Sequence, residues 1–289
     1  MAEPDLSVVI PTFRRERQLV EAIASALRQP KVSVEVIVID DSADGSAEAA
    51  VASIGDGRVR YVRRTVPSGG VPALGRNEGG ALARGRYVHF LDDDDRLVDG
   101  ASYALVSALD AAPNAGVAFG IVRPFGLDAD VLRAQEAYFS SAADRLCRTS
   151  SRMSLVSGML FDTTPLVNSA CMIRRACIGR VGGYATDIPR CEDVDFYLRA
   201  IRRCGFVFVD RVVVEYRTGA SSLMHDTPHD STLLRDSYRR IYGNYRREYG
   251  GAELFGLRLL AQWRKLRRRL GAHHRTAPSV AGRAPSLAD

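Results

Sequence analysis

The amino-acid sequence predicts an α/β protein with a mostly parallel central sheet flanked by helices. Through about the first ninety residues, apolar runs typical of strands alternate with segments of helical period. The run at residues 87–91, rich in β-branched and aromatic side chains, resembles a buried central strand and leads into four aspartates at residues 92–95. The run at residues 34–39 leads into Asp40 and Asp41. Both acidic clusters are therefore expected at one edge of the sheet.

The first third of the chain is expected to alternate strands and helices, an order that favours right-handed parallel connections. The first strand is expected to end at Pro11, because proline lacks the N–H that a ladder needs. The second helix is rich in alanine, and Asp44 or Ser46 is a candidate for its N-cap. The expected elements are strands 6–10, 34–39, 58–62 and 87–91 and helices 16–27, 46–54 and 73–83.

The rest of the chain is less regular. Residues 127–149 are amphipathic and charged, and we expect either a helical excursion or a mobile flap there. Residues 272–289 contain Pro, Gly, Ser and Ala without periodicity and are expected to be disordered. The other expected elements are helix 98–109, strands 116–122, 166–173, 206–209 and 212–216, helix 191–201, and two basic helices at about 231–249 and 252–270.

The composition is that of an ordinary soluble globular protein, with 46% apolar and 26% charged residues. The 289 residues allow one large α/β domain or two small ones. The five cysteines form no CxxC pair, and their odd number favours a reducing cytosolic environment. The N-terminus has no signal-peptide pattern, and no apolar run approaches the roughly 18 residues of a membrane span. We therefore expect a cytoplasmic protein.

The four aspartates at residues 92–95 would repel one another strongly unless a cation or solvent relieved them. Ligands of open α/β sheets bind outside the carboxyl ends of the strands, where these residues are expected. One interpretation is a site for a hard metal ion with a phosphate ligand. The alternative is a solvated acidic turn that caps the next helix. These residues alone favour neither.

A third acidic cluster, Glu192, Asp193 and Asp195, occupies the first turn of the helix at residues 191–201. The helix dipole favours acidic residues there, which is the purely structural explanation. Together with the two strand-end clusters, it indicates metal-assisted transfer from a phosphorylated donor, with a buried carboxylate as general base toward a hydroxyl. The residue types alone do not separate glycosyl, nucleotidyl and phosphoryl transfer.

Five motifs follow one another in a characteristic order: VVIPTF (8–13), VIVIDDS (36–42), GRNEG (75–79), GRYVHFLDDDD (85–95) and CEDVDF (191–196). Each motif is weak alone, but the ordered set over residues 6–217 resembles glycosyltransferase family 2, an inverting family with the GT-A fold. The resemblance implies a Rossmann-like domain at residues 1–225, with a nucleotide-binding half (1–97) and an acceptor-side half (98–225). Residues 226–271 would form a basic helical extension, followed by the tail.

For donor binding, the resemblance implies that Pro11 and Thr12 line the pocket of the nucleotide base. Asp40 or Asp41 would accept a hydrogen bond from the base or orient its contacts. Arg76 would lie nearby and pair with that acidic group or with a donor phosphate. The alternative for Arg76 is an ordinary arginine on a helix surface.

For the metal, the resemblance implies that Asp92 and Asp94 form the D-x-D pair that holds Mn²⁺ or Mg²⁺. Asp94 is the better candidate for direct metal contact, with Asp92 facing the ribose or the metal. Asp93 joins the donor-binding residues in a secondary role. Asp95 would add negative field or cap the following helix.

For catalysis, the Glu192-Asp193 pair resembles the E-D motif of the family, in which Asp193 would be the general base. It would remove the acceptor proton as the oxygen attacks the anomeric carbon opposite the diphosphate, so that a single displacement inverts this centre. Glu192 is the alternative base. Asp195 is assigned to the start of the helix.

The chain departs from the family pattern after the last expected strand. Many relatives carry a Tyr-Arg-x-His-x-x-Ser loop there, whereas residues 216–222 contain no histidine. Arg217 is retained, and His225 or His229 could replace the missing side chain as a metal ligand. The alternative is that these histidines are merely exposed.

The partners implied are a UDP-, dTDP- or GDP-linked sugar and a glycan, a lipid-linked or a small-molecule acceptor. No nucleic acid is expected, because the basic residues lack a recognition module. The last helix carries Leu259, Trp263, Leu266 and Leu270 on one face. It could touch anionic lipid at the inner face of the membrane, although a packed extension with solvated arginines is preferred.

Two other functions remain open from the sequence. A nucleotidyltransferase usually has a Gly-rich basic loop after its first strand, and residues 12–15 are basic but contain no glycine. A non-catalytic sugar-nucleotide binder would not need Asp92, Asp94 and Asp193 together.

Overall fold

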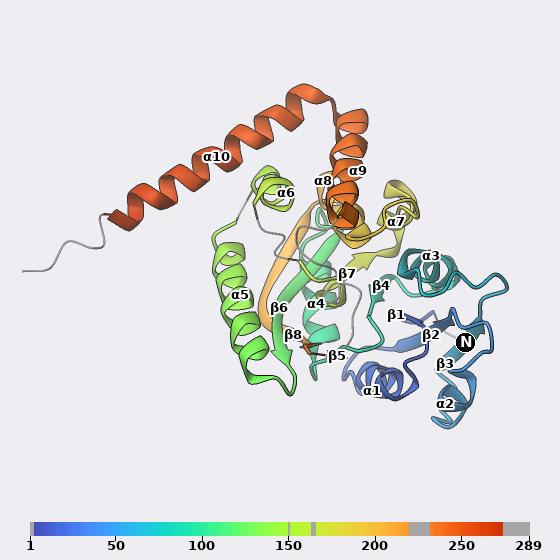
Figure 1. The fold of residues 1–289 in the computed structure, drawn as a ribbon. Helices are drawn as coiled ribbons and strands as arrows, with labels where there is room; N and C mark the ends of the chain where they lie inside the picture. Colours follow the sequence, from blue (N-terminus) through green and yellow to red (C-terminus); the bar gives the residue numbers. More distant parts are fainter. Residues whose placement is uncertain (1–2, 150, 163–165, 220–231, 274–289) are drawn as a thin grey trace, which may run out of the picture.

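The computed structural model describes residues 3–149, 151–162, 166–219 and 232–273 (Figure 1). In this part of the chain an eight-stranded sheet has the order β3-β2-β1-β4-β7-β6-β8-β5. The strands are β1 (Leu6–Thr12), β2 (Val34–Asp40), β3 (Val59–Arg63), β4 (Tyr87–Phe90), β5 (Arg96–Leu97), β6 (Val117–Phe125), β7 (Cys171–Arg174) and β8 (Phe206–Arg217).

Most of the sheet is parallel, as predicted. Strands β3, β2, β1 and β4 pair in parallel, and so do β6 and β8. Strand β7 runs antiparallel to both β4 and β6, and β5 runs antiparallel to β8. Thr12 lies opposite Asp40 in the register of β1 and β2, and its hydroxyl donates to Asp93 just after the parallel strand β4, so both acidic clusters reach the same edge.

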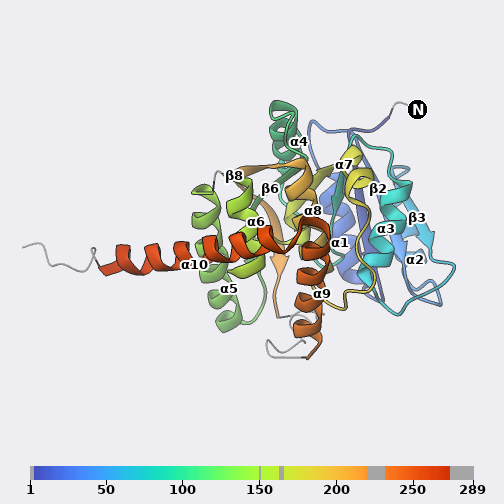
Figure 2. The same cartoon turned by 90° about the horizontal axis from the view of Figure 1, so that it is seen from above.

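Helices cover both faces of this sheet (Figures 1 and 2). Alternation along the strands divides the core: Val8 and Ile10 join the cluster under α1 and α4, whereas Val9 joins the cluster under α3 and α8. The helices are α1 (Glu16–Leu27), α2 (Glu48–Ala52), α3 (Pro72–Leu82), α4 (Ala101–Ala111), α5 (Ala129–Cys147), α6 (Arg152–Phe161), α7 (Arg175–Val181), α8 (Glu192–Cys204), α9 (Thr232–Tyr249) and α10 (Gly251–His273). No helix of the described residues is both long and apolar enough to cross a membrane.

Several predicted boundaries are wrong for identifiable reasons. Strand β1 continues through Pro11. Val9 O accepts from Leu91 N, so the backbone groups of Val9, and of the alternate residue Pro11, face β4. Pro11 lies beyond the last residue pair of β1 and β4, so its missing N–H costs the sheet no hydrogen bond. Residues 206–217 form one strand with a bulge opposite β6, not two. Residues 166–173 contain a 3₁₀ turn (Asn168–Ala170) before the strand begins.

Helix starts also differ from the expectation. The N-cap of α2 is Ala47, whose N–H donates to the Asp40 carboxylate, so neither Asp44 nor Ser46 caps it. The short strand β5 follows the four aspartates, and α4 begins after Gly100. Residues 127–149 are mainly helix α5, and α6 was not expected. In the tail, α10 reaches His273, and residues 274–289 lie outside the described residues.

Helix α3 approaches the sheet closely through two glycines. A Cβ on Gly75 would lie 2.9 Å from Pro11 Cβ, and a Cβ on Gly79 would lie 2.3 Å from Val9 Cγ1. This close packing brings the next residue, Arg76, to the carboxyl edge of the sheet.

We expect Gly79→Ala to lower the free energy of unfolding by about 1–3 kcal/mol, because the methyl group overlaps Val9 in a packed core. Gly80→Ala is the matched control: its Cβ would lie 3.4 Å from Phe90, an ordinary contact, and alanine improves helix propensity by up to about 1 kcal/mol. Chemical denaturation followed by circular dichroism measures both. Equal stability of the two variants would contradict this packing.

Candidate active site

A cleft of about 330 Å³ opens at the carboxyl edge of the sheet. Its walls come from the end of β1, the loop before α3, the first turns of α3, the aspartates after β4 and the start of α8. The predicted site residues that line it are Pro11, Thr12, Asp41, Arg76, Asp92, Asp93, Asp94, Glu192 and Asp193. The fold thus brings together residues that are widely separated in sequence.

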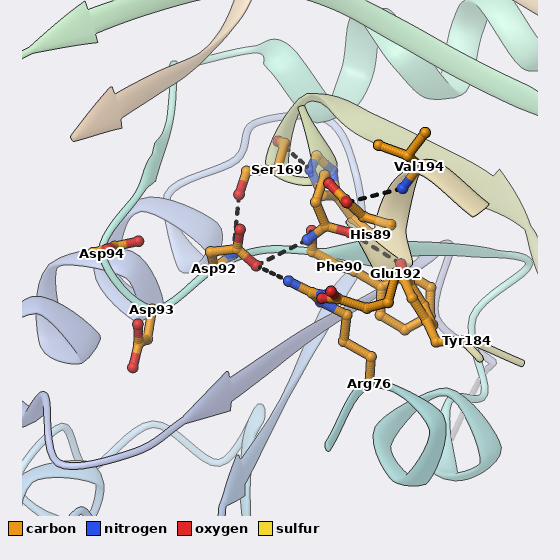
Figure 3. A network of polar contacts seen from close by, with 12 residues as sticks. Arg76, His89, Phe90, Asp92, Asp93, Asp94, Ser169, Tyr184, Glu192 and Val194 are labelled. Carbon is orange, nitrogen blue, oxygen red and sulfur yellow. Dashed lines mark hydrogen bonds and ion pairs between the residues drawn. The ribbon is translucent and has the colours of Figure 1, made fainter. Parts of the chain in front are cut away.

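Arg76 lies at the centre of the polar network (Figure 3). Its guanidinium is 2.7 Å from an oxygen of Asp92 and 2.6 Å from an oxygen of Glu192. It also lies over the Tyr184 ring, 5.2 Å from the centroid. The residue is only 4% exposed, so it is not a surface arginine. Its carboxylate partners are Asp92 and Glu192 rather than the predicted Asp40 or Asp41.

Asp92 is held on a second side as well. Asn168 Nδ2 donates to the same Asp92 oxygen at 2.9 Å, and Tyr184 Oη donates to Asn168 Oδ1 at 3.0 Å. The Asp92 backbone N–H donates to Ser169 Oγ. These contacts position the carboxylate before any ligand binds.

The next two aspartates use a different partner, Arg15. Thr12 Oγ1 donates to Asp93 at 2.7 Å, and Arg15 Nη1 contacts Asp93 at 3.2 Å and Asp94 at 2.8 Å. Burial and the neighbouring Asp94 charge raise the pKa of Asp93 to about 7. Burial and the Asp92 charge also raise the pKa of Asp94. Figure 3 shows Asp93 and Asp94 apart from the Arg76 network.

Asp95 closes the turn of the four aspartates, with its N–H donating to Asp92 O at 3.2 Å, but its side chain is buried in the core. It is buried and accepts a hydrogen bond from the Arg217 backbone N–H at 3.0 Å, which ties the end of β8 to the aspartates. Burial, with the charges of Asp94 and Asp92, raises its pKa well above the ordinary range. Because α4 begins only after Gly100, the aspartates do not cap it, and the interpretation as a solvated capping turn is wrong.

Asp193 forms no ion pair among the described residues. Val194 N–H donates to it at 2.8 Å, whereas the adjacent Glu192 is held by Arg76. Burial and the Glu192 charge raise the pKa of Asp193 to about 7. A carboxylate with a pKa near neutrality is suited to accept a proton from an alcohol. Asp195 instead pairs with Arg199 at 2.8 Å within α8.

The two aspartates after β2 have different positions. Asp41 lines the cleft, but its oxygens accept from Arg64, from the N–H and hydroxyl of Ser68 and from Gly70 N–H. It therefore orders the loop that forms one cleft wall. Asp40 lies outside the cleft lining and is fully buried. It accepts from Ser42 N–H, Ala47 N–H and Tyr61 Oη.

Sequence reasoning missed three residues that organise this site: Arg15, Arg64 and Asn168. The pair Arg14-Arg15 just after β1 could have indicated Arg15, because a loop at the carboxyl end of β1 lies next to the predicted acidic edge of the sheet. No local pattern identifies Asn168, whose partner Asp92 is 76 residues away.

The carboxylate oxygens of Asp92 and Asp94 are ligands of the type that a hard divalent cation prefers. Both carboxylates line the cleft. Burial and the Asp92 charge raise the pKa of Asp94, and a bound cation would relieve this electrostatic repulsion. Among the described residues, no group of three or more His, Cys, Asp or Glu could hold a metal. Mg²⁺-type ions commonly use one or two carboxylates with substrate phosphates and water, which agrees with this arrangement.

The loop that departs from the family pattern is only partly described. Arg217 Nε donates to Asp94 O at 2.9 Å, and its guanidinium pairs with Glu21 at 2.7 Å. His225 and His229 lie outside the described residues, so a metal role for either stays a prediction.

Comparison with known proteins agrees with the predicted resemblance. A family model described as "Glycosyl transferase family 2" matches residues 7–176, more than half of the chain. An uncharacterised protein of Mycobacterium tuberculosis is 30% identical over 216 residues, covering 72% of this chain and 65% of the relative. The GalNAc(5)-diNAcBac-PP-undecaprenol beta-1,3-glucosyltransferase of Campylobacter jejuni is 37% identical over 105 residues, covering 36% and 34%. The chain spans less than two thirds of either relative's length.

Solved structures share the fold at low sequence identity. TarS of S. aureus in complex with UDP-GlcNAc aligns with a TM-score of 0.60 and 17% identity, covering 84% of this chain and 66% of that one. The mannosyltransferase PcManGT from Pyrobaculum calidifontis, in complex with GDP-Man and Mn²⁺, aligns with a TM-score of 0.56 and 18% identity, covering 86% and 65%. These alignments confirm the predicted fold class.

We expect Arg76→Leu to lower the free energy of unfolding by roughly 3 kcal/mol at neutral pH, because Asp92 and Glu192 would remain close without a counter-charge. Arg14→Leu is the control, since Arg14 and its partner Asp44 are both 59% exposed and such pairs contribute at most about 1 kcal/mol. Chemical denaturation measures both variants. Similar losses for the two arginines would contradict a central role for Arg76.

Proposed function

The chain belongs to glycosyl transferase family 2, and we propose that it transfers a sugar from a nucleoside-diphosphate sugar to a hydroxyl acceptor with inversion. The observation that carries this proposal is the cleft itself. It places Asp92 and Asp94, suited to a cation and diphosphate, in the same space as Asp193, a carboxylate with a pKa of about 7.

The donor would lie along the carboxyl edge, with its base near the end of β1. Pro11 and Thr12 line this part of the cleft, and Asp41 orders the facing loop through Ser68 and Gly70. The solved neighbours, which are complexes with UDP-GlcNAc and with GDP-Man, support a nucleoside-diphosphate sugar as the donor class. The name of the Campylobacter jejuni relative supports a lipid-linked acceptor as one candidate.

Asp92 and Asp94 would hold a divalent cation, Mn²⁺ or Mg²⁺, at the donor diphosphate. Bound there, the cation would neutralise negative charge on the leaving group. Arg76 and Arg15 keep these carboxylates in place by their ion pairs, at 2.7 Å to Asp92 and 2.8 Å to Asp94.

Asp193 would serve as the general base. As the acceptor oxygen forms its bond to the anomeric carbon, its proton would pass to the Asp193 carboxylate. The bond from that carbon to the diphosphate oxygen would break, and the leaving diphosphate would keep the electron pair. Attack from the opposite face inverts the anomeric centre in one displacement. Glu192, which pairs with Arg76, would hold the start of α8 in position.

The test is an assay with a panel of UDP-, dTDP- and GDP-sugars and Mn²⁺, measuring release of nucleoside diphosphate and transfer to acceptors. Asp193→Asn should lower the transfer rate by about 10²–10⁴-fold, because general-base catalysis is lost. Donor affinity, measured by calorimetry, should stay nearly unchanged. Glu192→Gln is the comparison variant. A larger rate loss in Glu192→Gln than in Asp193→Asn would reverse the assignment, and absence of donor binding to the parent chain would refute the function.

The rate of transfer should depend on pH through Asp193. A base must be deprotonated, and its pKa is raised to about 7, so kcat/KM should fall about tenfold per pH unit below 7 and level off above it. With an unperturbed aspartate as the base, kcat/KM would begin to fall only below about pH 4. Any residual activity of Asp193→Asn should not show the fall of kcat/KM below pH 7. A flat profile from pH 5 to pH 8 would contradict the role of Asp193.

A further inference from the structure

Helix α10 has two apolar faces. Leu257 and Ala261 are buried, at 3% and 2% exposure, on the side that packs against the domain. The opposite side carries an outward stripe, which we define as Phe255, Leu259, Trp263 and Leu266, exposed by 62%, 48%, 53% and 54%. At about 100° per residue these four side chains fall within an arc of about 80°, roughly opposite Leu257. A helix of a soluble domain ordinarily has one apolar face.

The position of α10 explains why the outward stripe is uncovered. In Figures 1 and 2 the helix packs near α6 and its C-terminal part extends beyond the rest of the described chain. Arg264 on the inner side donates to Ser154 O at 2.6 Å, and Lys265, at the border between the inner side and the outward stripe, donates to Phe161 O at 2.9 Å. The stripe is therefore held outward by specific contacts rather than by chance rotation of the helix.

The charges around the outward stripe are positive. Arg258 and Lys265 border one side of it and Arg267 the other, with the Arg267 guanidinium over the Trp263 ring at 4.8 Å. The acidic residue of the helix, Glu253, is neutralised by two contacts of 2.9 Å from Arg202. The surface thus combines apolar and aromatic side chains with three cations that form no ion pair with the described residues.

A groove beside the outward stripe has the same chemistry. It lies between α6, α9 and α10, has a volume of about 980 Å³ and shares Phe255 with the stripe. Phe161 and Tyr242 give it an aromatic wall, and Arg246 and Arg258 line it as well. Its acidic lining residue, Asp162, is paired with Arg268.

We propose that α10 docks the protein on an anionic lipid surface, with the outward stripe in the interfacial layer and the flanking cations at lipid phosphates. An amphipathic helix with Trp and Leu between basic residues has the properties of an interfacial helix. A second copy of the chain fits less well, because a symmetric contact through this face would bring its cations together without acidic partners. Docking requires no turnover and is independent of the proposed function.

The test uses the full chain with phosphatidylcholine vesicles that contain or lack phosphatidylglycerol. Co-sedimentation should show strong binding only to the anionic vesicles, weakened by added salt. Trp263 is the chain's single tryptophan, so its emission should shift to shorter wavelength when these vesicles are added. The double variant Leu259→Ser/Leu266→Ser should bind at least tenfold more weakly, and Arg267→Gln roughly fivefold.

Tyr103→Ser is the matched control, because Tyr103 is 44% exposed on α4, outside this surface. It should bind vesicles like the parent chain. Unchanged circular dichroism and donor affinity in the double variant would separate lost docking from misfolding. Equal binding to both kinds of vesicle, or no effect of the double variant, would overturn the proposal. A parent dimer that the double variant converts to a monomer, without vesicle binding, would assign the outward stripe to a second copy.

Discussion

The site depends on one ionic bridge, formed by the buried guanidinium of Arg76 between Asp92 and Glu192. These acids are 16 and 116 residues from Arg76 in sequence, and they come from two different parts of the fold, the segment after β4 and the start of α8. Without a cation between them, two carboxylates in a poorly hydrated space would repel one another. The glycine face of α3 lets Arg76 reach this point. Because Asp193 follows Glu192 on the same helix turn, the bridge that holds Glu192 also positions the proposed base.

The carboxylates of the cleft differ because each has different partners. Glu192 and Asp92 share Arg76, and Asp93 and Asp94 share Arg15, whereas Asp193 forms no ion pair among the described residues. Burial and the Glu192 charge raise the pKa of Asp193 to about 7, and the Arg76 charge offsets only part of that rise. Burying a carboxylate without a counter-charge raises its folded-state pKa, so the folded state loses stability as pH rises from the ordinary pKa to the raised one, for Asp193 from 3.8 to about 7. A group that serves only the fold would therefore be expected to gain a partner. Among the described residues Asp193 gains no ion pair, and the Arg76 charge offsets only part of its raised pKa, which agrees with its proposed role as the base at the expense of stability.

Local patterns predicted local structure well, and long-range contacts poorly. The period of α1 gave its limits at Glu16 and Leu27, because that signal is contained in the helix itself. Which of Asp40 and Asp41 lines the cleft depends on contacts with the start of α2 and with the loop at residues 64–70. The pattern of the strand contains no information on these contacts. The carboxylate partners of Arg76 were mispredicted for the same reason, whereas its expected contact with a donor phosphate stays a prediction. The antiparallel direction of β7 depends on a chain path that no local pattern encodes.

The C-terminal helices show how one sequence pattern can support two interpretations. The apolar face with Leu259 and Trp263 was visible in the sequence, but the sequence could not tell whether it faced the core. In the structure, the inner face of α10 is occupied by its contacts with α6, so this second face points outward. Arg190 N–H, two residues before α8, donates to Ser237 Oγ at 3.0 Å, and Arg202 in the last turn of α8 pairs with Glu253 of α10. The extension that carries the outward stripe is therefore linked directly to the helix that carries Asp193.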